Sequence, residues 1–404
     1  MDGECFQGRV KNGRGLTRVV AREVERILSR RLYLCLGLAL PLVGFALFTA
    51  LFIGGIVTDL PVAVLDRDHS ALSRSVIRMA DATQGMAVVA QVADETQGKR
   101  GILSGRYHGL LVLPRDMEKD ILRGRSVVPT FYYNNQLYLV GSSLKRAMGK
   151  VGGTVSAGVD MARRMKTGEG RAAAVVHMDP VGVDTRILFN PHLNYTHYLY
   201  LALLPAMLMI FAMGQTLHAL GIERKEDTLD EWLDIAGGSP VTALVGKLLP
   251  HTLILILSGA AMEIFTFGLM GIPLNGSPGF ILFSTLVFIL ACQGAALFIF
   301  CLLKDMDTCV GLTSAYSASA FAFAGVTFPA MGMPQWAQGY SAALPLPHYI
   351  HIIVGQSLKG ADILHSMAGF KALLIFALAL PLVSLVLVRL PGGIFAQKRK
   401  IHHV

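Results

Sequence analysis

The stretch from Gly221 to Pro240, GIERKEDTLDEWLDIAGGSP, places six acidic and two basic residues between two long apolar runs. Carboxylates at this density could take part in acid-base chemistry, or they could form a contact surface for a partner. The choice depends on whether the chain contains the other groups that an enzyme needs.

The motifs of common nucleotide-binding and hydrolytic sites are absent from this sequence. A phosphate-binding P-loop needs Gly-x-x-x-x-Gly-Lys followed by Ser or Thr, but Arg, Val and Leu follow the Gly-Lys pairs at 98–99, 149–150 and 246–247. His-Glu-x-x-His and Gly-x-Ser-x-Gly are also missing, and no Cys-x-x-Cys or Cys/His spacing indicates a metal site. We predict no catalytic residue, metal or cofactor on this chain, which leaves transport, or scaffolding and signalling.

The composition is typical of a membrane protein. Of 404 residues, 53% are hydrophobic and 16% are charged, and the mean hydropathy is +0.53. A helix needs roughly 20 apolar residues to cross a hydrocarbon core of about 30 Å. Six stretches reach that length: Tyr33–Val57, Tyr198–Leu220, Val241–Met270, Phe280–Leu303, Val310–Met331 and Ala368–Leu390. The predicted fold is a polytopic α-helical membrane protein with six transmembrane helices, the last five lying within residues 196–390.

The basic residues are distributed as membrane topology requires and not as a nucleic-acid patch. The formal net charge is +9, and eight bases lie in residues 1–32 and three in the tail, residues 391–404. Because cytoplasmic flanks carry an excess of Lys and Arg, both termini are predicted to be cytoplasmic. The first apolar run exceeds the ~7–15 residues of a signal peptide, so it is expected to remain as a span. The lipid bilayer is thus an expected partner, and nucleic acid is not.

Residues 58–195 separate the first two spans and are too many for a connecting loop. Four short apolar runs alternate there with polar segments of helical length: Pro61–Asp66, Met86–Val92, His108–Pro114 and Val127–Asn134. This alternation indicates βαβ units with a sheet covered on both faces. We predict an inserted extracytoplasmic α/β domain that ends in a long helix from Leu137 to about Lys166.

An amphipathic helix is predicted within residues 1–32. One face carries apolar side chains and another carries arginines at four-residue spacing: Leu16, Val19, Val20, Val24 and Ile27, against Arg18, Arg22, Arg26 and Arg30. Such a helix is expected on the cytoplasmic membrane surface, with its apolar side in the acyl boundary and its arginines at anionic headgroups. Glu23 interrupts the apolar face. The alternative is a plain basic topology signal without a helix.

Residues 332–366 mix prolines with aromatic residues: Pro334, Pro345 and Pro347, with Trp336, Tyr340 and Tyr349. Prolines break helices and aromatic side chains prefer the headgroup level. The pattern predicts an outer re-entrant segment that dips into the outer leaflet or lies on it, with an ordinary loop as the alternative.

Three polar residues inside the predicted spans are candidates for an intramembrane role. Glu263 lies near the middle of one span, and Gln215 and Gln293 lie in two others. Ionisable residues within spans often mark ion pathways, whereas amides often hydrogen-bond between helices. For Glu263 both interpretations remain open, and for the two glutamines the interhelical one is favoured.

The charged stretch itself has helical periodicity. On a helix starting near Glu223, apolar residues recur on one face: Leu229, Trp232, Leu233 and Ala236. Acids collect opposite: Glu223, Asp227, Asp230, Glu231 and Asp234. The pattern predicts an amphipathic helix within 221–240 on the cytoplasmic side, which either contacts a partner or is a solvated loop helix without one.

These residues resemble the coupling segment of type-2 ATP-binding-cassette exporter permeases, which reads Glu-Gly-Thr-Leu-Glu, then a Leu pair, a Pro and Gly-Lys at the next span. The matching residues are Glu226–Leu233, Ser239–Pro240 and Gly246–Pro250, with Asp227 in place of the usual Gly. A second resemblance lies in the outer segment, at Phe328, Pro329, Pro334, Trp336 and Pro345. A third is Phe189-Asn190-Pro191 before the second span, as in members with a large extracytoplasmic domain.

The resemblance implies a permease of the bacterial inner membrane that exports a lipophilic or amphipathic substrate. Its expected partners are a nucleotide-binding ATPase, which would bind ATP and Mg²⁺, a second permease chain, identical or paralogous, and a periplasmic adaptor with an outer-membrane channel. It also implies ATPase-coupling residues: Glu223, Glu226, Thr228, Leu229, Asp230, Trp232 and Leu233. The alternative is a membrane scaffold or receptor whose outer domain binds a partner without transport.

Overall fold

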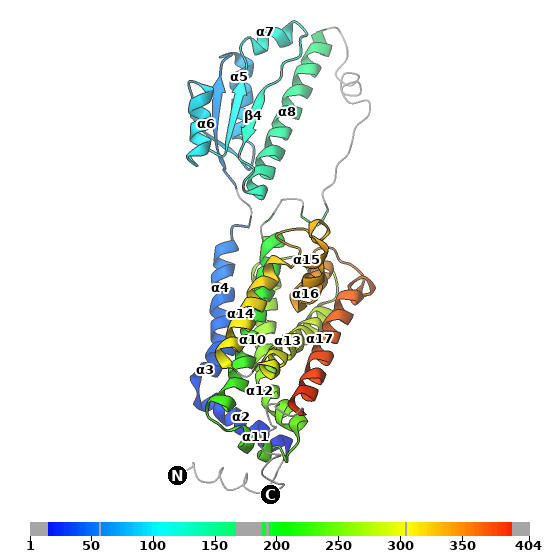
Figure 1. The fold of residues 1–404 in the computed structure, drawn as a ribbon. Helices are drawn as coiled ribbons and strands as arrows, with labels where there is room; N and C mark the ends of the chain where they lie inside the picture. Colours follow the sequence, from blue (N-terminus) through cyan, green and yellow to red (C-terminus); the bar gives the residue numbers. More distant parts are fainter. Residues whose placement is uncertain are drawn as a thin grey trace, which may run out of the picture. The chain divides into compact units, whose positions relative to one another are not determined.

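The computed structural model describes residues 15–55, 58–166, 188–190, 194, 196–303 and 305–389 (Figure 1). Residues 1–14 and the tail 391–404, for which cytoplasmic placement is predicted, lie outside the described residues. The chain divides into two compact units, one formed by residues 1–53 with 195–404 and the other by residues 54–194.

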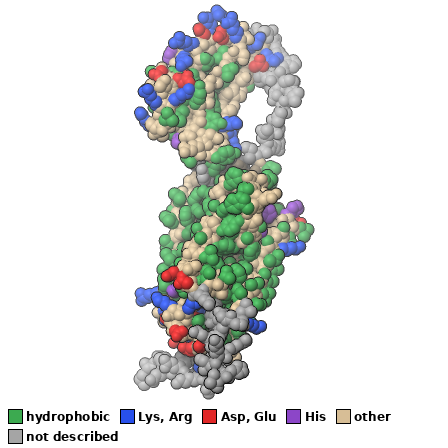
Figure 2. Space-filling model, in the orientation of Figure 1, with side chains coloured by type: hydrophobic (Ala, Val, Ile, Leu, Met, Phe, Trp, Pro, Cys, Tyr) green, Lys and Arg blue, Asp and Glu red, His purple; other side chains and the backbone are tan. Residues whose placement is uncertain are grey.

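Five helices among the described residues are long and apolar enough to cross a membrane: Arg31–Phe52, Thr196–Lys225, Pro240–Leu269, Pro278–Leu302 and Ile363–Arg389. They consist of α3 (Arg31–Leu34), η1 (Cys35–Ala39) and α4 (Leu40–Phe52); η2 (Thr196–Tyr200) and α10 (Leu201–Lys225); α12 (Pro240–Glu263) and η3 (Ile264–Leu269); α13 (Pro278–Leu302); and α17 (Ile363–Arg389). They correspond to predicted spans one to four and six. Figure 2 shows apolar side chains over most of the visible face of this helical unit.

The fifth predicted span, Val310–Met331, has wrong bounds. The helix found there is α14 (Met306–Ala322), with 17 residues, or about 25 Å at ~1.5 Å per residue. It begins early because the Asp305 side chain accepts a hydrogen bond from the Thr308 backbone N–H at 2.8 Å and caps it. The helix ends before Gly325, which adopts a positive φ of 80°. Apolar residues continue past this helix end, so the predicted span ended too late.

The predicted outer segment contains a 3₁₀ turn, η4 (Ala330–Gly332), and two short helices, α15 (Gln335–Ala342) and α16 (Pro345–Ser357). Pro345 is the first residue of α16, where a missing backbone N–H has no cost. Helix α16 packs against α10, α13 and α17. The segment is therefore largely helical and is not an ordinary loop.

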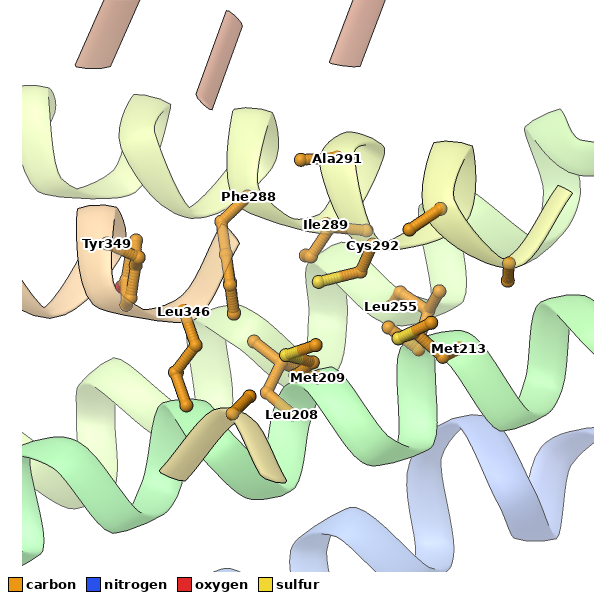
Figure 3. Close-up of a cluster of buried hydrophobic side chains, with 14 of the residues drawn as sticks. Leu208, Met209, Met213, Leu255, Phe288, Ile289, Ala291, Cys292, Leu346 and Tyr349 are labelled. Atoms are coloured by element: carbon orange, nitrogen blue, oxygen red, sulfur yellow. The ribbon is translucent and has the colours of Figure 1, made fainter. Parts of the chain in front are cut away.

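The core of the helical unit lies between α10, α12, α13 and α16 (Figure 3). Its side chains interdigitate from all four helices: Leu208, Met209 and Met213 from α10, Leu255 from α12, Phe288, Ile289 and Cys292 from α13, and Leu346 and Tyr349 from α16. The rings of Phe288 and Tyr349 stack with centroids 4.5 Å apart. Such close packing makes this part of the helical unit rigid.

The unit of residues 54–194 contains the predicted α/β fold. Its sheet has the order β2-β1-β3-β4, formed by β1 (Pro61–Asp66), β2 (Ala87–Gln91), β3 (Gly109–Leu113) and β4 (Thr130–Tyr133). Strand β1 is parallel to β2 and β3, whereas β4 is antiparallel to β3, so the βαβ prediction holds for the first three strands only.

Helices cover both faces of this sheet, as the apolar strands predict. They are α5 (Ala71–Asp81), α7 (Met117–Leu122) and α8 (Tyr138–Lys166) on one face, and α6 (Glu95–Leu103) on the other. Along β1, Val62 and Val64 face the first layer, while Ala63 and Leu65 face the second. This alternation is the pleat of a strand that is buried on both sides.

Candidate coupling site

Helix α2 (Leu16–Ser29) is the predicted amino-terminal amphipathic helix. It packs against α12, and its apolar face is directed at that helix through Val19 and Ile27. The approach is close, because a Cβ placed on Gly246 would lie 2.8 Å from the Cβ of Val19. The backbone N–H of Gly15 also donates to the carbonyl of Ile235 at 3.0 Å, which ties α2 to α11 (Leu229–Ile235). In Figure 1 these two helices lie side by side at one end of the helical unit.

Glu23 is a partner of buried cations and does not merely interrupt the apolar face of α2. Its carboxylate accepts a hydrogen bond from Lys247 Nζ at 2.7 Å and lies 3.0 Å from His251 Nε2. Both Glu23 and Lys247 are at most 1% exposed. A buried charge needs a charged or hydrogen-bonded partner, so α2 and α12 can pack in this way only with both groups present.

Glu223, at the end of α10, gathers three cations. Lys247 Nζ donates to it at 2.8 Å, Arg22 donates from both terminal nitrogens at 2.7 and 3.1 Å, and Arg26 also donates to it. Arg30 binds the next acid, Glu226, at 2.6 Å. For Arg22, Arg26 and Arg30, acids of the same chain therefore take the place of the anionic headgroups that were expected as their partners.

The pKa of Glu23 reflects this environment. Burial by itself raises the pKa of the Glu23 carboxyl, but the hydrogen bond from His251 and the charge and hydrogen bond of Lys247 outweigh it. The pKa is thus held below its ordinary value of 4.5. The carboxylate form is the one that this packing stabilises.

The predicted single helix from Glu223 to Ala236 is wrong. Helix α10 continues to Lys225, a turn follows, and α11 begins at Leu229. Asp227 in the turn has a φ of 54°, in the left-handed region that favours glycine and tolerates Asp. This conformation explains why the resembled motif has Gly there, and it removes Glu223 and Asp227 from the acidic face of α11.

Helix α11 presents two faces, as its periodicity predicts. Trp232 is 1% exposed, its indole N–H donates to the Ala243 carbonyl at 3.2 Å, and Lys247 Nζ lies 5.4 Å from the ring centroid. Leu233 and Ala236 are buried beside it. The apolar face is therefore bound to α12 within the chain and is not open to a partner.

The other predicted coupling residues lie in three different settings. Glu223 is buried, Thr228 and Leu229 are half-buried, and Glu226 and Asp230 are exposed. The Thr228 hydroxyl donates to Glu223. Glu231 and Asp234 extend the exposed acidic face of α11, hereafter the acidic face (Asp230, Glu231, Asp234).

These acids and cations form one ionic cluster: Glu23, Glu223, Arg22, Arg26, Lys247 and His251. Sequence reasoning missed Lys247 and His251 as site residues. A signal was available, because Glu23 and Lys247 each carry a charge within an apolar pattern, and such charges are seldom buried without a partner. Their separation of 224 residues hid the pairing from any local pattern.

The predicted intramembrane polar residues hydrogen-bond between helices. Gln215 Nε2 on α10 lies 2.9 Å from His251 Nδ1 on α12, so His251 extends the ionic cluster into the bundle. Thr252 donates to Gln293 at 2.8 Å, and Thr285 donates to Glu263 at 2.6 Å and lies 2.7 Å from the Tyr349 hydroxyl. In this geometry Gln215, Gln293 and Glu263 each form a hydrogen-bonded contact to a neighbouring helix.

The outer-segment residues lie apart from the coupling region. Phe328, Pro329, Pro334 and Trp336 are exposed, and Pro345 is buried at the start of α16. The hydroxyl of Tyr198, just before α10, donates to the Val326 carbonyl, whereas the ionic cluster is at the far end of α10. Among the described residues, no group of three or more His, Cys, Asp or Glu could hold a metal ion.

Comparison with known proteins gives consistent matches. Residues 31–386 match a family model described as ABC-2 family transporter protein. The chain is 21% identical over 306 residues to the inner membrane transport permease YhhJ of Escherichia coli K12, covering 74% of this chain and 77% of that protein. It is 24% identical over 178 residues to the probable multidrug ABC transporter permease YbhR of the same organism, covering 43% and 47%.

Proposed function

The chain belongs to the ABC-2 transporter family, and from that premise we propose that it is the permease subunit of an ATP-driven exporter in the bacterial inner membrane. ATP and Mg²⁺ bind to a separate nucleotide-binding subunit in this proposal. The absence of a P-loop from the sequence supports the assignment of nucleotide binding to a separate subunit. Two permease chains, identical or paralogous, enclose the path, and both termini of each are cytoplasmic.

The proposed substrate is lipophilic or amphipathic and moves outward. The apolar character of the candidate spans supports this, as does the word multidrug in the name of one relative. Residues 54–194 then form the extracytoplasmic domain that receives or passes on the substrate. A periplasmic adaptor and an outer-membrane channel are further proposed partners.

The coupling proposal rests on the ionic cluster, which lies next to α11 and its acidic face. Lys247 on α12 contacts Glu23 on α2 and Glu223 on α10, and Trp232 fixes α11 to the same stretch of α12. Removing one partner of a buried ion pair costs about 3–5 kcal/mol. A displacement of α11 should therefore move α2, α10 and α12 together, because separating these helices would break buried ion pairs.

The acidic face is the proposed contact for the ATPase. Its three carboxylates are exposed while the apolar side of α11 is buried, so charge is what α11 offers a partner. Charged surfaces of this kind set the rate and specificity of association. We expect a basic surface on the nucleotide-binding subunit opposite Asp230 and Glu231.

Co-purification from native membranes tests the proposal. The tagged chain should retain an ATPase, and Asp230→Lys should weaken that association about tenfold. Asp362→Lys is the matched control, because Asp362 is an exposed acid beside the start of α17, away from α11.

Two results would count against this function. Consistent absence of an ATPase would favour a scaffold or receptor whose outer domain binds a partner. Equal retention of the ATPase by Asp230→Lys and the unmodified chain would remove the acidic face from the contact.

A further inference from the structure

The α/β unit contains a groove along the edge of its apolar core. It has a volume of about 400 Å³ and lies between α8, the α5 and α7 layer and the connection at residues 124–129. Val151, Val155 and Val159 line it from one face of α8. Val151 is buried in that core and Val155 packs against it, whereas Val159 is half-buried and extends the apolar stripe of α8 beyond the core.

One end of the groove is cationic. Arg125 and Arg163 both line it, and the guanidinium of Arg163 reaches across to Gly124, where a Cβ would lie 3.6 Å from its Nη2 atom. Asp160 also lines the groove but pairs with Arg164 at 2.8 Å, whereas Arg125 lies 3.4 Å from a carboxylate of its own, Asp120. Among the described residues, Arg163 has no carboxylate partner.

The dimensions of the groove limit its occupant. Its lining on α8 runs from Met148 to Arg163, which is about 22 Å along a helix at ~1.5 Å per residue. The volume is spread along that length, so the groove is elongated. An extended apolar chain can lie along it.

We propose that this groove binds an amphipathic anion with a single slender apolar chain, the chain lying along Val151, Val155 and Val159 and the anionic group at Arg125 and Arg163. A mostly apolar cleft with a few convergent polar groups is the usual form of a small-molecule site. Binding in this groove does not require ATP-driven transport. The inference that the bound anion is also the transported substrate rests on the proposed function.

Two adjacent glycines on α8 allow a matched test. A Cβ at Gly152 or at Gly153 would meet no atom within 4 Å, but only Gly152 lines the groove. Gly152→Phe should fill the groove, and Gly153→Phe should leave it open. Neither change should weaken the helix, because glycine is a poor helix former.

The experiment uses the full chain in lipid nanodiscs, without ATPase or ATP, and a photoactivatable long-chain fatty acid as probe. Crosslinked peptides are mapped by mass spectrometry, which separates labelling of the groove from labelling of the spans by lipid-dissolved probe. Labelling of peptides from residues 117–163 should fall about tenfold in Gly152→Phe and persist in Gly153→Phe. Thermal unfolding of both variants checks that each is folded.

Competition tests the charge. The unlabelled fatty acid should displace the probe, whereas the alcohol and the amine of equal chain length should not, and Arg163→Gln should abolish the preference for the acid over the alcohol. The proposal fails if residues 117–163 are not labelled, if the two glycine variants are labelled equally, or if the amine competes as well as the acid. None of these outcomes depends on the ATPase, so they are distinct from a failure of the proposed function.

Discussion

Lys247 is a fully buried lysine that contacts two carboxylates, Glu23 on α2 and Glu223 on α10. A buried ion pair adds little net stability compared with apolar packing, but loss of one partner leaves an uncompensated charge. The cluster is therefore better understood as a device that fixes the relative positions of three helices than as a source of stability.

Replacing Lys247 with Met leaves both glutamates buried without this cation, and we expect it to destabilise the helical unit by about 3–5 kcal/mol. Lys225→Met, which changes an exposed lysine at the end of α10, should change stability by at most about 0.5 kcal/mol. Thermal unfolding of the detergent-purified chain measures both variants. Equal effects of the two substitutions would show that the contacts of Lys247 carry no energy.

The lowered pKa of Glu23 predicts a pH dependence. A carboxyl whose pKa is lower in the folded state contributes stability above its unfolded pKa, near the ordinary value of 4.5, and loses it as the pH falls through the folded pKa. Glu23→Gln should therefore lower the unfolding temperature most near neutral pH, and the difference should shrink below about pH 4.5. Glu25→Gln, on the exposed side of α2, is the matched control, and the same trend in both variants would contradict the assignment.

At the scale of elements, α11 is held by its apolar face. Trp232→Ala should cost about 3–5 kcal/mol, because the indole is buried and its N–H donates to Ala243. The variant should thus lose stability before any effect on coupling can be read, whereas Trp232→Phe should keep most of the packing. Unfolding temperatures and yields of the two variants measure this. A stable Trp232→Ala protein would show that α11 is not anchored in this way.

The elements also show what could be predicted from sequence. The apolar faces of α2 and α11 follow from local periodicity, and the strands of the α/β unit follow from short apolar runs. The break at Asp227 was missed although the resembled motif has Gly there, because a positive φ is uncommon for a residue other than glycine. The end of α14 at Ala322 was missed because apolar residues continue past it, and the partner of Glu23 was missed because it lies 224 residues away.

At the scale of the whole molecule, the acidic face at one end of the helical unit is continuous with helices that run through the unit. Helix α12 begins beside α11 and, with η3, extends to Leu269, about 45 Å at ~1.5 Å per residue. A displacement at the acidic face can therefore reach the opposite end of the unit along a single continuous helical element, which contains Pro250. The polar contacts of Glu263 with Thr285 and of Thr285 with Tyr349 lie near that end.

Site-specific photocrosslinking in native membranes tests the central claim most directly. A photoreactive residue in place of Asp230, exposed on α11, should crosslink to a nucleotide-binding subunit. The same residue in place of Gly279, which is exposed at the start of α13 and faces open space, should not. Crosslinking of the ATPase from Gly279 alone, or its absence from position 230 in a chain that still transports, would contradict the account.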